Sequence, residues 1–156
     1  MKFLKLSFLA FLVATVIISC GKEYSSEMMR HSTGDWQFTN GGKNYSGYLD
    51  TVYQTIGVGS NVLYIIGKTD DGSQNFQLKL YGNSFSPRSY YASQYQSSFS
   101  YSIPAKTIYD ANALNGEFVV NLTVLDSAKI QGTFSGTALD SANNFIQITN
   151  GIFTTY

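Results

Sequence analysis

Apolar and polar side chains alternate with a period of two along most of the chain after residue 35. Residues 118–124 place Phe118, Val120, Leu122 and Val124 on one face, and residues 76–80 and 130–138 repeat the pattern. Successive side chains of a β-strand point to opposite faces, so each run is typical of a strand that is buried on one side. No stretch sustains a helical period. A chain with this pattern is restricted to β-sheet folds.

Asn-Gly and Asp-Gly pairs separate these runs, and such pairs favour tight hairpins. They occur at Asn40-Gly41, Asp71-Gly72, Asn115-Gly116 and Asn150-Gly151, the last being either a turn or a bulge within one closing strand. The chain is therefore predicted to be all-β, an antiparallel β-sandwich or flattened barrel of roughly seven to nine strands.

Residues 83–109 depart from the pattern because they are rich in Ser and Tyr and contain both prolines. Phe99, Tyr101 and Ile103 still alternate, but the rest of the segment is predicted to be a long loop. Long loops in compact domains are disproportionately functional.

The first nineteen residues have the three parts of a secretory signal peptide. Lys2 and Lys5 precede an apolar run over residues 6–18, and small Ser19 closes it. The run is shorter than the roughly 20 residues that a membrane-spanning helix needs, so a signal peptide over residues 1–19 is favoured over an uncleaved anchor.

The end of this segment, Ile17-Ile18-Ser19-Cys20, resembles the lipobox of bacterial lipoproteins, with Ile18 where Ala or Ser is more usual. The resemblance implies a diacylglycerol on the Cys20 thiol, cleavage before Cys20 and a fatty acyl group such as palmitate on the new amino group. The alternative is a buried free cysteine at the end of a membrane helix. Gly21 in place of Asp favours the outer membrane; the periplasmic or surface face stays open.

Residues 20–34 show no period and are predicted to be a lipidated cysteine with a flexible tether, followed by one domain over residues 35–156. His31 falls in this tether and is interpreted as a solvated linker residue. From Cys20 onward the chain has ten acidic and eight basic residues, a net charge of −2. Without a basic cluster, nucleic acid is excluded as a partner.

The C-terminal sequence resembles that of small Bacteroidota lipoproteins with a domain of unknown function. Ile130, Gly132, Thr133, Phe134, Ser135 and Gly136 match a Gly-Thr-Phe-Ser-Gly strand, and Ile148, Thr149, Asn150, Gly151 and Phe153 match an Ile-Thr-Asn-Gly-x-Phe ending. The resemblance covers most of residues 35–156. It implies a β-sandwich lipoprotein without catalytic residues.

Residues suited to catalysis or metal binding are scarce. The single cysteine and the single histidine exclude a disulfide, a thiolate metal cluster and an ordinary nucleophilic triad, and Ser135 falls outside the Gly-x-Ser-x-Gly spacing. No catalytic residue, metal or cofactor is expected. A glycan hydrolase needs only two carboxylates, but most candidates lie at expected turns: Asp50, Asp70, Asp71, Asp110, Glu117, Asp126 and Asp140.

Three Asp-Ser/Thr-aliphatic triplets begin at Asp50, Asp126 and Asp140. They resemble the acceptor for O-glycosylation of exported proteins in Bacteroidota. Thr51, Ser127 and Ser141 are the acceptors that this resemblance implies, and each triplet also suits a turn.

Aromatic side chains supply the remaining candidate site. Tyrosine offers a rigid apolar face and a polar tip, which suits stacking on sugar rings. The proposed platform comprises Trp36, Tyr90, Tyr91, Tyr95 and Tyr101. The alternative is that these rings fill the core or shield a sheet edge.

The sequence thus predicts a lipid-anchored, noncatalytic envelope module that binds a glycan or a protein partner. The alternatives are a structural or accessory subunit of an envelope complex and, least favoured, a carboxylate-based glycan hydrolase. The oligomeric state is left open.

Overall fold

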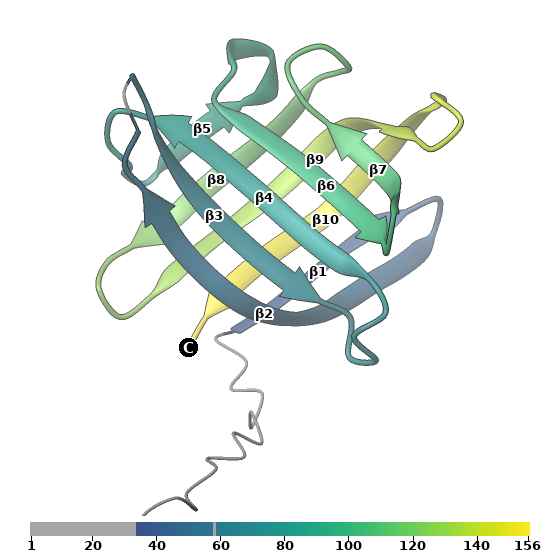
Figure 1. Ribbon diagram of the computed structural model, residues 1–156, viewed down its shortest axis with the longest axis horizontal. Helices are drawn as coiled ribbons and strands as arrows, with labels where there is room; N and C mark the ends of the chain where they lie inside the picture. Colours follow the sequence, from purple (N-terminus) through teal and green to yellow (C-terminus); the bar gives the residue numbers. More distant parts are fainter. Residues whose placement is uncertain (1–33, 58) are drawn as a thin grey trace, which may run out of the picture.

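The computed structural model describes residues 34–57 and 59–156, which form ten β-strands and one short 3-10 helix (Figure 1). The strands are β1 (Gly34–Asn40), β2 (Lys43–Thr55), β3 (Asn61–Lys68), β4 (Asn75–Gly82), β5 (Arg88–Tyr91), β6 (Ser97–Ile103), β7 (Lys106–Ala111), β8 (Phe118–Leu125), β9 (Ile130–Asp140) and β10 (Phe145–Thr155), and the helix is η1 (Ala92–Gln94). The predicted signal peptide, Cys20 and His31 lie outside the described residues.

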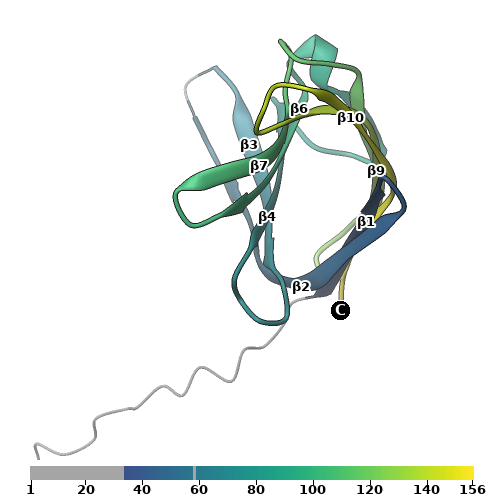
Figure 2. The same cartoon turned by 90° about the vertical axis from the view of Figure 1, so that its right-hand side faces the viewer.

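The sheet closes on itself. Its hydrogen-bonded order is β10-β1-β2-β3-β4-β6-β7-β9-β8-β5, and β10 also pairs with β9, which completes an eight-stranded antiparallel ring with β5 and β8 attached. Figure 2 looks toward the open end of this ring. The prediction of an all-β sandwich or flattened barrel is confirmed in its second form, with ten strands in place of the roughly seven to nine expected.

One side of the barrel is built from interrupted strands. β10 occupies one edge of β9 from Gln131 to Leu139. β8 and β7 therefore share the other edge, β8 along its first part and β7 only at Leu139 and Asp140. β5 pairs with β8, and β6 pairs with β7. β5 and β6 therefore follow each other along the wall as one interrupted line of strands, a broken path. β7 and β8 form a second broken path beside it.

Both paths break at the same level of the wall. β5 and β8 meet last at Tyr91 and Val119, and β6 and β7 meet last at Phe99 and Ala111. The residues between these pairs, η1 on one path and the 112–117 loop on the other, project together at the top of Figures 1 and 2. The first strand begins at the opposite side.

The prediction of a long loop over most of residues 83–109 is wrong. This segment contains β5, η1, β6 and β7. Its Ser and Tyr residues alternate between the outer surface and the core, as Ser98, Phe99, Ser100 and Tyr101 do on β6. The alternation of Phe99, Tyr101 and Ile103 marks β6 as expected, whereas β5 and β7, with four and six residues, are too short to show a clear period.

Aromatic rings fill the barrel interior. Trp36 stacks on Phe76 with centroids 4.6 Å apart, and its indole N–H donates a hydrogen bond to the Tyr48 carbonyl at 3.1 Å. The position opposite this ring is Gly67, where a Cβ would lie 2.5 Å from the indole. Burial of such rings is the main stabilising contribution that a small barrel has available. The interior is a packed core.

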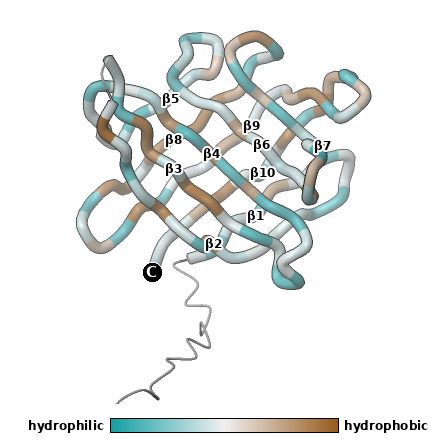
Figure 3. The backbone as a smooth tube through the Cα atoms, in the orientation of Figure 1, coloured by the Kyte–Doolittle hydropathy of each residue, from teal (hydrophilic) through white to brown (hydrophobic). Residues whose placement is uncertain are grey.

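Most predicted inward positions of β4, β8 and β9 are confirmed, because Phe76, Leu78, Val120, Phe134 and Ala138 are buried. Val124 is the exception, because the register of β8 shifts after Leu122 and Leu125 packs against the core in its place. Figure 3 shows the resulting mixture of hydrophobic and hydrophilic positions along the strands. Asn40-Gly41 and Asp71-Gly72 form hairpin turns as expected. Asn150-Gly151 lies in a bulge within β10, the second of the two expected forms.

None of the helices in the described part of the chain has the length and apolar character needed to cross a membrane.

Candidate functional site

A groove crosses the outer face of β5, β8, β9 and β10. It has a volume of about 490 Å³, and it is called the outer groove below. That volume falls within the roughly 300–1,000 Å³ of small-molecule sites. The residues whose side chains line its walls and floor are Tyr91, Ser93, Glu117, Val119, Ser135, Thr137 and Gln147.

Strand register sets these side chains in two rows. In the first row Tyr91 pairs with Val119, which pairs with Ser135. In the second row Thr137 donates its backbone N–H to the Glu117 carbonyl at 2.7 Å and pairs with Gln147 on β10. Side chains opposite each other in such rows have Cβ atoms about 5 Å apart, so each row presents a continuous set of contacts.

The chemistry of the outer groove is polar around one aromatic ring. Tyr91 is 44% exposed. Hydroxyl groups of Ser93, Ser135 and Thr137 and the amide of Gln147 also line the groove, and Glu117 is the only charged residue in the lining. A rigid ring next to several hydrogen-bonding groups is suited to a ligand that is both polar and ring-shaped.

Backbone constraints fix the groove. Gly136 on its floor has φ +131°, and a Cβ there would lie 2.1 Å from the Glu117 carbonyl oxygen. At the other wall, the Gln96 N–H donates to the Tyr91 carbonyl at 3.0 Å and the Tyr95 N–H donates to the Ala92 carbonyl at 2.8 Å. These contacts hold Tyr91 at the end of β5 without any need for the ligand to order it.

A second cleft, called the loop cleft below, separates η1 from the 112–117 loop. Its volume is about 360 Å³ and its exposed lining is mainly apolar. Tyr95 and Leu114 stand on its two sides and are 71% and 86% exposed. Figure 3 shows a hydrophobic segment on the loop that follows β7.

The 112–117 loop is held by side-chain hydrogen bonds. Asp110 Oδ2 accepts from Asn112 Nδ2 at 2.7 Å and from Asn115 Nδ2 at 2.9 Å. The Leu114 N–H donates to Asn112 Oδ1 at 2.8 Å. Because the loop satisfies its own polar groups, it can present Leu114 to solvent in a defined position.

The five aromatic residues predicted as a platform do not form one. Tyr91 lines the outer groove and Tyr95 lines the loop cleft. Trp36, Tyr90 and Tyr101 are buried to 1% exposure or less, so assigning them to a ligand site was wrong. All three occupy inward positions of their strands, where the alternative of a filled core holds.

Tyr90 and Tyr91 illustrate the difference, since they are neighbours on one strand. The Tyr90 hydroxyl donates to the Ser86 carbonyl and accepts from the Ser86 N–H, both at 3.0 Å, and Arg88 lies 4.5 Å from its ring centroid. Tyr91 points to the outside. Alternation on β5 therefore separates a core residue from a surface residue.

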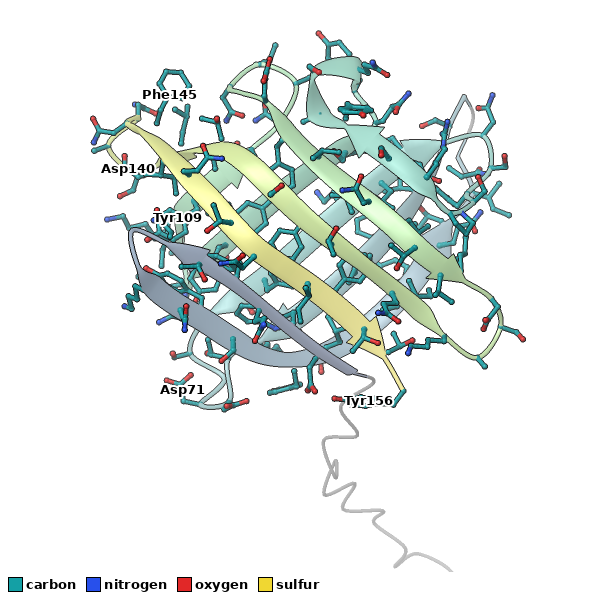
Figure 4. All side chains as sticks on the ribbon, turned by 180° about the vertical axis from the view of Figure 1, so that it is seen from behind. Asp71, Tyr109, Asp140, Phe145 and Tyr156 are labelled. Carbon is teal, nitrogen blue, oxygen red and sulfur yellow. The ribbon has the colours of Figure 1, made fainter. Side chains whose placement is uncertain are left out.

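Two of the carboxylates considered for hydrolysis line a common cleft. Asp110 and Asp140 border a cleft of about 340 Å³ near the β9–β10 hairpin, where Figure 4 shows Asp140 and Phe145 above Tyr109. Asp110 is bound to two asparagine amides as described. Hydrogen bonds from the Asn144 backbone and side chain lower the pKa of Asp140, which favours its ionised form over a proton donor.

The predicted glycosylation acceptors lie in two settings. Ser127 and Ser141 are exposed in the β8–β9 and β9–β10 hairpins, where Asp126 and Asp140 each accept the N–H of the alanine two residues later at 2.8 Å. Thr51 is half-buried within β2, so the expectation of a turn there is wrong. Glycosylation of the three sites stays a prediction.

Several site residues were not anticipated. Ser93, Gln147 and Leu114 were absent from the predicted site, and Ser135 and Glu117 were considered only for catalysis. Their signal was the outward half of the alternation pattern, which marks surface positions without indicating which of them share a groove. No group of three or more His, Cys, Asp or Glu residues within 34–57 and 59–156 is placed to hold a metal ion.

No protein-family model, curated protein or solved structure matches this chain. The resemblance to Bacteroidota lipoproteins therefore stays a prediction, and the function is argued from the clefts.

Proposed function

We propose that this protein is a lipid-anchored module of the cell envelope that binds a glycan in the outer groove without catalysing a reaction. The observation that carries the proposal is an exposed tyrosine ring, Tyr91, in a preformed groove lined by hydroxyl and amide groups. Sugar rings offer an apolar face for stacking and hydroxyl groups for hydrogen bonds, so this lining matches both.

The position of the groove supports this role. Phe145 and Tyr156 mark the start and end of β10 in Figure 4, at the upper and lower edges of the barrel. The outer groove crosses β10 at Gln147, near the upper edge, whereas Gly34 pairs with Thr155 near the lower edge. A lipid on Cys20 would approach from the side of Gly34, so the groove would remain accessible above a membrane.

The carboxylates favour binding over hydrolysis. Hydrolysis of a glycosidic bond uses two carboxyl groups that flank the bond. The lining of the outer groove holds Glu117 alone, and Asp110 and Asp140 border a different cleft. The outer groove thus has the contacts for a sugar and lacks a paired acid and base.

The test is glycan-array binding by a soluble chain from Thr33 to Tyr156. All strand pairings of the described residues fall within 34–155, so this chain retains the barrel that they form. Tyr91→Ala should abolish binding because it removes the stacking surface. Tyr53→Ala is the matched control, since Tyr53 is 42% exposed on β2 and lies outside the groove. Equal binding by both variants, or no glycan bound by any of them, would contradict the proposal.

A second candidate function rests on the loop cleft. Its apolar lining and the exposed Tyr95 and Leu114 suit an apolar side chain of an envelope protein, as expected for an accessory subunit. Leu114→Ser should then reduce capture of that protein from envelope extracts while glycan binding is unchanged. Capture that is insensitive to this substitution would remove the second candidate.

A further inference from the structure

We infer that the outer groove selects a glycan carrying a free, protonated amino group. The inference rests on the proposed function and names the sugar class that the groove takes. It follows from the single charge in the lining, the carboxylate of Glu117, which shares the groove with the exposed ring of Tyr91.

Glu117 is available for a ligand. Within the described residues its carboxylate has no hydrogen-bond or ion-pair partner, and the one ion pair of that region joins Lys68 to Asp50. The backbone of Glu117 is fixed by the hydrogen bond from Thr137. An exposed carboxylate on a fixed backbone can pair with a cation at little conformational cost.

The surrounding elements supply no competing cation. β5, η1, β8, β9 and β10 carry only two charged side chains, Arg88 and Asp140. Arg88 lies over the Tyr90 ring, and the Asp140 carboxylate is occupied by amides of its own turn. Glu117 therefore sets the sign of the charge in the groove, and an anionic sugar would meet a like charge.

The ring and the carboxylate are placed to share one ammonium group. Tyr91 pairs with Val119, and Glu117 lies two residues before Val119. Diagonal neighbours of this kind are about 7–8 Å apart, within reach of an aromatic and a long side chain. A protonated amine can then contact the ring face and donate a charge-assisted hydrogen bond to the carboxylate. Thr137 and Gln147, which share the second row with Glu117, can then form hydrogen bonds with the neutral hydroxyl groups of the sugar.

The test compares chitosan oligosaccharides, which are glucosamine chains, with chitin oligosaccharides of the same length, whose amines are acetylated. Calorimetry on the full-length chain in detergent should give about tenfold tighter binding of chitosan, the gain expected for one charge-assisted hydrogen bond. Added salt should reduce the preference because it screens an exposed ion pair.

Glu117→Gln should bring the two affinities together by weakening chitosan alone. Asp70→Asn is the control, because it removes an exposed carboxylate from the β3–β4 hairpin and changes the net charge equally. The inference is overturned if chitin binds as tightly as chitosan, or if the preference for chitosan survives Glu117→Gln. The proposed function still holds in that case if binding on the glycan array depends on Tyr91. Absence of binding to both oligosaccharides would also overturn the inference, and the array then decides whether the proposed function falls with it.

Discussion

The two halves of the barrel solve different problems with the same kind of strand. β1 to β4 run as continuous strands, each paired with the next along the chain, and their inward side chains include Trp36, Phe38 and Phe76. β5 to β8 cover their wall in two broken paths. Both halves bury side chains in the core, and the broken half also borders the two surface hollows.

The comparison shows how a barrel with a filled interior can still offer a binding site. A continuous strand keeps its outer face even, because its side chains alternate at fixed spacing. β5 ends and β8 begins at the same level of the wall. η1 and the 112–117 loop leave the wall there, and one cleft forms on each side of this break. Substitutions in the two halves should therefore differ in their effects on stability and on glycan binding.

Trp36→Ala should cause the largest loss of stability in the continuous half. It would leave a cavity beside Phe76 and remove the hydrogen bond to the Tyr48 carbonyl. We expect the free energy of unfolding in urea to fall by about 3–5 kcal/mol, the usual cost of truncating a large buried ring. In the broken half, Tyr91→Ala should stay within about 0.5 kcal/mol. Equal losses for the two variants would contradict the division.

Gly136→Ala should produce an intermediate effect that links stability to the groove. The added Cβ would meet the Glu117 carbonyl oxygen, and φ +131° is unfavourable for alanine. We expect a loss of about 1–3 kcal/mol in urea unfolding, together with weaker glycan binding. Gly41→Ala is the comparison for the clash alone, because Gly41 also has a positive φ, +57°, but a Cβ at that exposed turn meets nothing within 4 Å. If a folded Gly136→Ala protein binds the glycan as tightly as the unaltered protein does, Gly136 does not form the floor of the glycan site.

Asp110→Ala should loosen the 112–117 loop with a smaller effect on the whole fold. The substitution removes the acceptor for Asn112 and Asn115. We expect a loss of about 1–2 kcal/mol, the scale of side-chain hydrogen bonds to a charged group, and faster amide hydrogen exchange confined to the loop. Exchange that also rises in β1 to β4 would show that the two halves are not separable.

Removing one hydrogen bond from the β3–β4 hairpin should have the smallest effect on stability. Hydrogen bonds from Thr69 and Ser73 lower the pKa of the Asp71 carboxyl to about 2. A depressed pKa in the folded state means that this contribution is present above the unfolded pKa near 3.8 and is lost as the pH falls through about 2. Thr69→Ala should move the Asp71 titration, followed by NMR, toward its ordinary value. If the Asp71 carboxyl of the unaltered protein already titrates near 3.8, these hydrogen bonds do not lower its pKa.

The fold was largely predictable because alternation marks buried faces directly. Phe118, Val120 and Phe134 were assigned to the core from spacing alone, and all are buried. β5 escaped prediction because it has only four residues, whereas the alternation of Phe99, Tyr101 and Ile103 already indicated part of β6. Closure into a barrel depends on which strands pair, and the pairing of β9 with three partners has no signature in local sequence.

The candidate site was less predictable. Tyr91 and Tyr95 line two different clefts and do not share one platform, and Tyr90 could not be separated from Tyr91 without knowing that β5 exists. Glu117 and Gln147 lie thirty residues apart in the chain and meet only through the register of β8, β9 and β10. Such a groove is a property of the sheet and not of any one segment.

The most direct test of the central claim is chemical-shift mapping of the isotope-labelled chain, titrated with the glycan that binds most strongly on the array. We predict shifts confined to the lining of the outer groove, led by the backbone amides of Tyr91, Glu117, Ser135 and Gln147, with β1 to β4 unchanged. Shifts centred on β1 to β4, or on the loop cleft alone, would contradict the assignment of the glycan site to the outer groove.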